Sequence, residues 1–459
     1  MKISKIVTSL FIAGVLAAPL AYATNGMNLE GYGPVAASMG GASMAYDNGT
    51  AAVMNNPATL GLMSDGGRLD IALGLLAPNI TAKCDAGPCA GMEAKSLADA
   101  FFMPAVGYAK KSGQLTYGVG VFSQGGMGTE YEGNTFMSAG SGLKTRSEVG
   151  VGRFIVPMAY DVDDKFTVAG SLDYVWAGMD LQMAMAAPQM GAMAAAGLLV
   201  GSGTGAAALP AFLGGATNVG YFDFSDSSKF SGKAKGTGLA GKLGMTYKAN
   251  SQLTVGASYH SKTSLKDLTA GGAKMSMIDN AGSLGGPAGT TYTLTGDVKI
   301  INFQWPETYG VGVAYQATDS LMVVADYKRI QWSKVMKNFH MTFSSADMGG
   351  VNLDITLPQD WKDQNVYELG VAFKTSDALT LRAGVNVANN PVPDQYMNPM
   401  FPAIAKSHIT VGAGYALSDV SSLDFSYAYV PKSSATNTPG GTTVDFGGYG
   451  MQLLYSYRM

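Results

Sequence analysis

Few residues of this chain stand in arrangements that could perform catalysis. Its three histidines, His260, His340 and His408, are isolated in the sequence, so each is expected to line a wall or a loop rather than act as a base. Three histidines and two cysteines cannot build a zinc site of the usual kind without carboxylates. The sequence carries no G-x-S-x-G elbow, no H-E-x-x-H pair and no Walker A loop. We expect no metal, no cofactor and no catalytic residue, although catalytic groups can also assemble from distant strands without leaving a motif.

One glycine-rich segment, residues 236–241, matches a dinucleotide-binding fingerprint letter for letter, as Gly-Thr-Gly-Leu-Ala-Gly. That fingerprint needs a strand before it and a helix after it. Here every second position continues the alternation, through Leu239, Gly241, Leu243, Met245 and Tyr247. The pattern predicts a continuing strand and no nucleotide site.

The two cysteines, Cys84 and Cys89, flank Gly87 and Pro88, which turn the chain back on itself. In an oxidising compartment this arrangement predicts a local disulfide at a loop tip. Metal binding is the alternative, but no histidine lies nearby and two thiolates alone make a poor site.

The composition indicates a chain whose solvent is partly lipid. Of 459 residues, 47% are hydrophobic, only 14% are charged and 61 are glycine, without a Gly-X-Y period, so neither collagen nor a disordered chain fits. The formal charge is −3 and neither sign forms a block. Nucleic acid is therefore not an expected partner, because the electrostatic footprint that it needs is missing.

The first residues predict export. Lys2 and Lys5 precede an apolar run over residues 6–18, and Ala21-Tyr22-Ala23 is a small-x-small cleavage site. We interpret residues 1–23 as a signal peptide that is cut after Ala23. An uncleaved membrane anchor is the alternative, but the apolar run is shorter than the ~20 residues that a spanning helix needs.

The rest of the chain has a period of two. In the last segment, aromatic and apolar residues from Tyr449 to Met459 occupy every second position, and most residues between them are small or polar. Similar segments occur near residues 166–176, 379–386 and 422–429. Strands of about ten residues that end in aromatics are typical of bilayer-spanning barrels.

The turns allow the strands to be counted. Six short polar reversals, each after an aromatic residue, alternate with seven long irregular stretches. Thirteen connections join fourteen strands, so residues 65–459 are predicted to form an all-β, 14-stranded antiparallel transmembrane barrel with long extracellular loops. The rival is a helical membrane protein. Its best support is the charge-free stretch 181–222, which we interpret instead as an apolar loop with a short helix.

Residues 24–64 precede the first strand. They are rich in glycine and alanine, too long for a tail and too apolar to remain in water. A barrel of this size has a lumen that must be filled or conduct. The segment is therefore predicted to be a plug.

Several motifs in order resemble the FadL family of outer-membrane transporters for long-chain fatty acids and other hydrophobic compounds. They are Asn56-Pro57-Ala58, the glycine-rich residues 118–131, Trp305-Pro306-Glu307 with the strand that follows, residues 326–332, residues 381–384 and residues 390–394. Each motif alone is weak, but their order and spacing cover essentially the whole mature chain.

The resemblance implies a barrel closed by an N-terminal hatch that carries Asn56, Pro57 and Ala58. It also implies capture of substrate between long extracellular loops, passage to an inner site, and lateral exit through a kink in the third strand. Here that strand is residues 115–122, and Gly125 and Gly126 after it are the candidate exit. The alternatives are a turn without a gating role at residues 56–58 and a simple loop start at Gly125.

The two longest loops, residues 180–237 and 262–306, correspond to the pair that the family uses for capture. The apolar candidates for ligand capture in the first of them are Met190, Met193, Leu198, Leu199, Leu209, Phe212 and Leu213. Each CH₂ moved out of water gains about 0.8 kcal/mol, so an apolar path suits a greasy molecule. The alternative is that these side chains pack against one another.

We therefore expect passive uptake of long-chain fatty acids or similar hydrophobic molecules across a bacterial outer membrane. The expected partners are that molecule, outer-membrane lipid, and the barrel-assembly machinery during biogenesis, although the chain ends in Met459 where the assembly signal typically has an aromatic residue. A general porin and an outer-membrane esterase are the alternatives.

Overall fold

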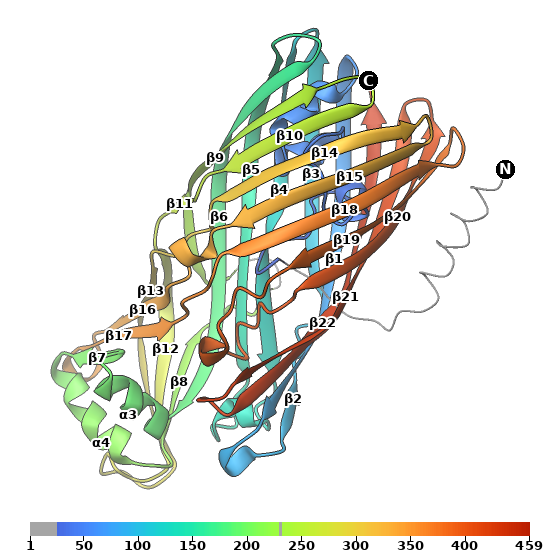
Figure 1. The fold of residues 1–459 in the computed structure, drawn as a ribbon. Helices are drawn as coiled ribbons and strands as arrows, with labels where there is room; N and C mark the ends of the chain where they lie inside the picture. Colours follow the sequence, from blue (N-terminus) through green and yellow to red (C-terminus); the bar gives the residue numbers. More distant parts are fainter. Residues whose placement is uncertain (1–24, 229–231) are drawn as a thin grey trace.

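The computed structural model describes residues 25–228 and 232–459, so the predicted signal peptide, residues 1–23, lies outside the described residues. Antiparallel pairing joins the strands into one sheet that closes on itself, because the last strand pairs with the first (Figure 1). In order, the ring passes through β1 (Gly66–Cys84), β3 (Phe101–Ser112), β4 (Leu115–Tyr131), β5 (Thr145–Asp161), β6 (Phe166–Ala186), β9 (Ala234–Lys248), β10 (Leu253–His260), β14 (Thr308–Thr318), β15 (Leu321–Ile330), β18 (Gln364–Lys374), β19 (Leu379–Ala388), β20 (Ser407–Ser418), β21 (Ser421–Asn437) and β22 (Thr442–Arg458).

The prediction was a barrel of fourteen strands, and the sheet as a whole has more strands than that. The sheet contains 22 strands among the described residues, and the additional ones lie in connections that were predicted to be irregular. They are β2 (Glu93–Lys95), β7 (Leu199–Ser202), β8 (Val219–Phe224), β11 (Ser264–Leu265), β12 (Leu268–Asp279), β13 (Thr290–Ile301), β16 (Asn338–Ser345) and β17 (Val351–Pro358). The physical reason is that backbone groups of long connections also need partners. Here the connections pair with each other and with the extended end of β6.

The two faces of the barrel wall differ as the period of two requires. Leu172, Leu243 and Met158 point outward and are 63%, 64% and 60% exposed, whereas the residues that alternate with them face the interior. An outward apolar band is what a barrel presents to lipid. Short turns lie at one end of the barrel and the long connections extend from the other (Figure 1).

Helices are short and occur in the N-terminal segment and the connections. None of those in the described ranges, 25–228 and 232–459, has the length and apolarity to cross a bilayer. The charge-free stretch 181–222 contains the end of β6, two α-helices, one 3-10 helix and strands of the loop region, in agreement with its interpretation as an apolar loop with a short helix. The α-helices are α2 (Pro34–Ala37), α3 (Ala187–Ala195) and α4 (Leu209–Gly214). The 3-10 helices are η1 (Gly49–Val53), η2 (Pro57–Leu62), η3 (Gly87–Cys89), η4 (Phe136–Ser138), η5 (Thr204–Ala208), η6 (Trp332–Lys334), η7 (Asp347–Gly349) and η8 (Asp394–Tyr396).

The N-terminal segment, residues 25–64, lies inside the ring of strands (Figure 1). Almost all of its residues are buried. Its hydrogen-bond partners come from opposite sides of the ring, on β4, β9, β15 and β20. A segment that bonds to all of these strands must occupy the interior of the barrel.

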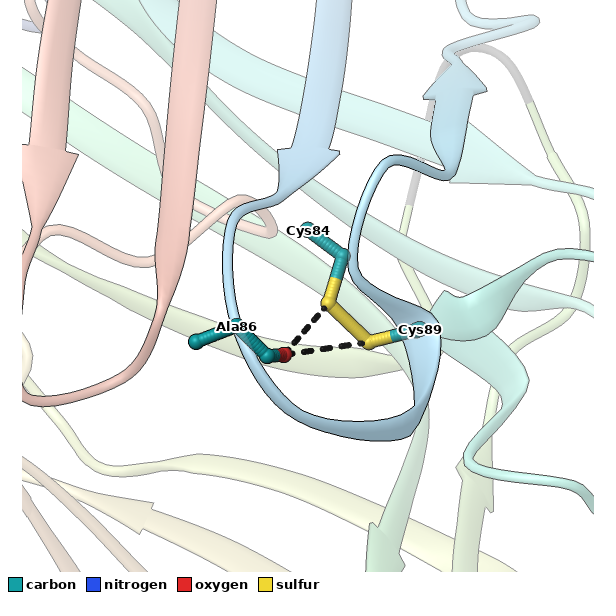
Figure 2. The surroundings of a disulfide bond; sticks show 3 residues. All are labelled: Cys84, Ala86 and Cys89. Carbon is teal, nitrogen blue, oxygen red and sulfur yellow. Dashed lines mark hydrogen bonds between the residues drawn. A yellow bond between two sulfur atoms is a disulfide. The ribbon is translucent and has the colours of Figure 1, made fainter.

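A disulfide joins Cys84 at the end of β1 to Cys89 in η3 (Figure 2). Both Sγ atoms lie near the carbonyl oxygen of Ala86, at 3.1 Å for Cys84 and 3.9 Å for Cys89. The bridge closes a tight loop at the end of the barrel that carries the long connections.

Candidate functional site

The barrel wall has a gap between β3 and β4. The two strands pair from Ser112 opposite Leu115 to Ala105 opposite Phe122, and beyond that point residues 101–104 of β3 have no paired residue on β4. The pairing of β4 with β5 also shifts register between Ser123 and Gly125. A bulge bends its strand and increases the local twist, so β4 turns away from β3 here.

Gly125 and Gly126 lie at this bend, inside a strand that continues to Tyr131. The alternative that they merely begin a loop is therefore wrong. Gly125 has φ +149°, and a Cβ on it would lie 2.1 Å from the carbonyl oxygen of Met27. Only glycine fits that conformation and that close approach.

The N-terminal segment supplies the backbone partner that β3 does not. The amide of Gly126 donates to the carbonyl oxygen of Met27 at 3.1 Å, and Asn28 forms a β-bridge with Gly125. The side chain of Asn28 is itself held, because its Oδ1 accepts from Nε1 of Trp305 at 2.7 Å. Backbone groups in a membrane must find partners, and this contact provides one where the wall opens.

A cavity of about 490 Å³ lies at the gap. Its lining includes inward residues, such as the buried Val149 and Val151, and outward residues, such as Phe102 and Trp176, which are 45% and 38% exposed. The cavity, here called the wall cavity, therefore passes from the interior to the outer surface of the barrel. Its volume is within the range of about 300–1,000 Å³ that is typical of small-molecule sites.

Glycines form part of the lining of the wall cavity. A Cβ on Gly150 would meet nothing within 4 Å, whereas a Cβ on Gly152 would lie 2.2 Å from the ring of Trp176. The polar lining residues include Glu148 and Lys235. The site is thus largely apolar with a few polar groups, which suits a hydrophobic molecule better than a hydrated ion.

The predicted hatch motif forms a tight turn that is bonded to the wall. Asn56 caps η2 by accepting from the amide of Ala58 at 3.1 Å, and Pro57 occupies the first helical position. Nδ2 of Asn56 donates to the carbonyl oxygens of Met44 at 2.7 Å and of Met245 on β9 at 3.1 Å. The motif therefore connects two parts of the N-terminal segment to the barrel.

Polar residues of the strands hold a second part of the N-terminal segment. Asp326 Oδ2 accepts from the amides of Ser43 at 2.6 Å and Met44 at 3.0 Å. Nearby, Asn386 Nδ2 donates to the carbonyl oxygen of Gly40 at 3.0 Å. The amide of Gly40 donates to Thr410 Oγ1 at 2.8 Å. No local motif in the sequence marks this role. Charged and polar residues on otherwise apolar strands were the available signal.

A charge cluster crosses three neighbouring strands on the inner wall. Asp173 on β6 is fully buried and accepts from Arg153 Nη1 on β5 at 2.7 Å, and it also pairs with Lys242 on β9. Close by, His260 Nε2 lies 2.6 Å from the carbonyl oxygen of Asn55. The other two histidines, His340 and His408, are far from His260 in the chain. His340 Nε2 lies 3.0 Å from Oδ1 of Asp354 in the loop region.

The residues predicted to capture ligand lie in the loop region rather than at the wall cavity. Met190 and Phe212 are 0% exposed and pack in the apolar core. Leu199 and Leu209 are also buried, Met193 and Leu213 pack against that core, and Leu198 is half-buried. The expected open apolar surface is not formed by these side chains here, because the helices α3 and α4 fold them inward.

Comparison with known proteins places the chain in a family. The family described as outer membrane protein transport protein (OMPP1/FadL/TodX) matches residues 11–453. The P. putida toluene transporter TodX is 30% identical, with a TM-score of 0.84 over 94% of this chain and 99% of that chain. The Ralstonia pickettii toluene transporter TbuX is 31% identical, with a TM-score of 0.75 over 94% and 99% of the two chains.

A match to a curated relative is shorter. Outer membrane protein P1 of Haemophilus influenzae is 26% identical over 195 residues, which is 42% of this chain and 38% of that protein. The matched region thus spans well under half of that relative. The match of the family to nearly the whole chain is the decisive one: this protein is a member of the OMPP1/FadL/TodX family of outer-membrane transport proteins.

Proposed function

We propose that the protein is a passive channel that takes up small hydrophobic molecules across the bacterial outer membrane, with lateral exit beside Gly125 and Gly126. The observation that carries this proposal is the wall cavity of about 490 Å³, whose lining comes from both faces of the barrel wall. Such a path lets an apolar molecule avoid water, which would cost about 25 cal/mol for each Å² of apolar surface exposed.

The substrate class proposed first is monoaromatic hydrocarbons, with long-chain fatty acids as the second. Two similar structures, TodX and TbuX, are described as toluene transporters and are 30% and 31% identical to this chain. Residues 25–64 act in this proposal as the plug that prevents leakage of hydrophilic solutes through the lumen. Capture by the loops 180–237 and 262–306 remains part of the proposal.

Gly150 offers a direct test of lateral exit. Gly150→Leu should slow uptake of radiolabelled toluene, because Gly150 lines the wall cavity and the larger side chain would occupy part of it. The barrel should tolerate the change, because a Cβ at this position meets nothing within 4 Å. Substitution of Gly125 or Gly126 is a poorer test, since a Cβ on either would lie 2.1 Å from a backbone oxygen.

The matched control is Gly170→Leu. Gly170 lies on β6, where a Cβ would make only ordinary contacts at 3.5 Å and 3.7 Å, and it does not line the wall cavity. Both variants should assemble and show the same heat-modified mobility on a gel. Undiminished toluene uptake by Gly150→Leu would contradict lateral exit at this site.

A further inference from the structure

The carboxyl group of Glu30 is buried inside the barrel without a hydrogen-bond partner for one of its oxygens. Glu30 is 2% exposed, and in the part of the chain that the structure describes its Oε2 has no partner. Burying a polar group without a partner is unfavourable, and burying an unpaired charged group is more so. This cost points to a partner that the polypeptide does not supply.

The charged neighbours of Glu30 are already engaged. Lys328 attracts it, but the ammonium group of Lys328 donates to the carbonyl oxygen of Gly41 and to Glu368, both at 3.0 Å. Asp70 accepts from the amide of Thr50 at 2.7 Å and pairs with Arg68 at 3.2 Å. Among residues 25–228 and 232–459, no cation is therefore placed to pair with Oε2 of Glu30.

Glu30 lines a small cavity of about 40 Å³ between the N-terminal segment and the strands β1, β3, β4 and β22. A water molecule needs at least about 10–15 Å³ of such space. The small cavity is therefore larger than a packing defect and has room for a polar group. The small cavity adjoins the wall cavity. The two share the lining residues Leu76, Met103, Pro104 and Ser123.

We propose that Glu30 accepts a hydrogen bond from a hydroxyl group on the transported molecule, so that the channel favours neutral hydroxylated hydrophobic molecules over carboxylates. The inference rests on the proposed function. The apolar body of the molecule would lie in the wall cavity and its hydroxyl group in the small cavity. A carboxylate placed there would face Glu30 in a poorly hydrated space, where like charges repel strongly.

Burial raises the pKa of Glu30 to about 7. Near neutral pH the group is thus present in both forms, and either form has an oxygen that accepts a hydrogen bond. The acceptor role therefore does not depend on one protonation state.

Three probes that differ in one substituent test the proposal: toluene, p-cresol and p-toluate. Their dissociation constants are measured by ligand-observed NMR on the protein in nanodiscs. For each protein we take the ratio of the toluene dissociation constant to the p-cresol dissociation constant. The deciding quantity is this ratio in the wild type divided by the same ratio in Glu30→Ala, because the hydration of each probe cancels in the quotient. We expect this quotient to be about ten, as for one hydrogen bond to a carboxyl group.

Glu30→Gln keeps a hydrogen-bond acceptor and removes the charge, so it should keep part of the p-cresol preference and bind p-toluate better than the wild type does. It also serves if Glu30→Ala fails to fold. A quotient near one, with toluene still bound, would overturn the role of Glu30 and leave the channel function standing. If none of the three probes binds to the wild type, both the inference and the proposed function fail.

Discussion

Glu30 should make the stability of the protein depend on pH, and one substitution should remove that dependence. The residue precedes the first strand, and burial raises its pKa from 4.5 to about 7. Between these two values the folded state holds a proton that the unfolded chain has released. Stability from this group is therefore fully present below about pH 4.5 and is lost as the pH rises through about 7. The pKa difference is about 2.5, and at about 1.36 kcal/mol for each unit the loss is about 3 kcal/mol.

Glu30→Gln avoids this loss because its amide does not ionise. It should be about 3 kcal/mol more stable than the wild type at pH 8 and nearly equal to it at pH 4. The measurement is guanidinium unfolding of the detergent-purified protein at the two pH values, followed by tryptophan fluorescence. All other titrating groups are common to both proteins, so the difference between them isolates residue 30.

Asp99→Asn is the control, because it removes one carboxylate that is exposed in a connection. It should not reproduce the gain of about 3 kcal/mol at pH 8 that is expected of Glu30→Gln, because the side chain is not buried. Equal stability of Glu30→Gln and the wild type at pH 8 would refute the reasoning. It would mean that the Glu30 carboxylate is solvated or paired in the folded state.

Other substitutions test the contacts inside the barrel. Asp173→Ala should destabilise the protein by about 3–5 kcal/mol, because it leaves the buried Arg153 and Lys242 without their counter-ion. Guanidinium unfolding measures this loss of stability. A loss below about 1 kcal/mol would mean that the cluster is hydrated. Asn56→Ala removes a helix cap and two side-chain donations and should cost about 2–3 kcal/mol locally. Hydrogen exchange should then quicken in residues 57–62 and not in the strands, and unchanged exchange there would contradict the anchoring role of Asn56.

Much of the barrel could be predicted from local pattern. The alternation around residues 166–176 and 449–459 determines which side chains face lipid, because successive side chains of a strand point to opposite faces. Neighbouring residues likewise predicted the short turns between strands. They also predicted a continuing strand at residues 236–241, which the structure places within β9. The strands in the long connections were missed because their pairing depends on other connections and not on their own sequence alone.

The site depended on contacts between distant residues. Sequence alone predicted an apolar-faced barrel from its period of two and an N-terminal segment too apolar to remain in water, because composition and periodicity act locally, whereas Gly125 and Gly126 were singled out by the family resemblance. Only the tertiary structure decided that Met27 pairs with Gly126, that the candidate capture residues are packed inward, and that Glu30 lies beside a cavity without a partner. Those outcomes follow from strand register and from packing between segments far apart in the chain, which no local pattern encodes.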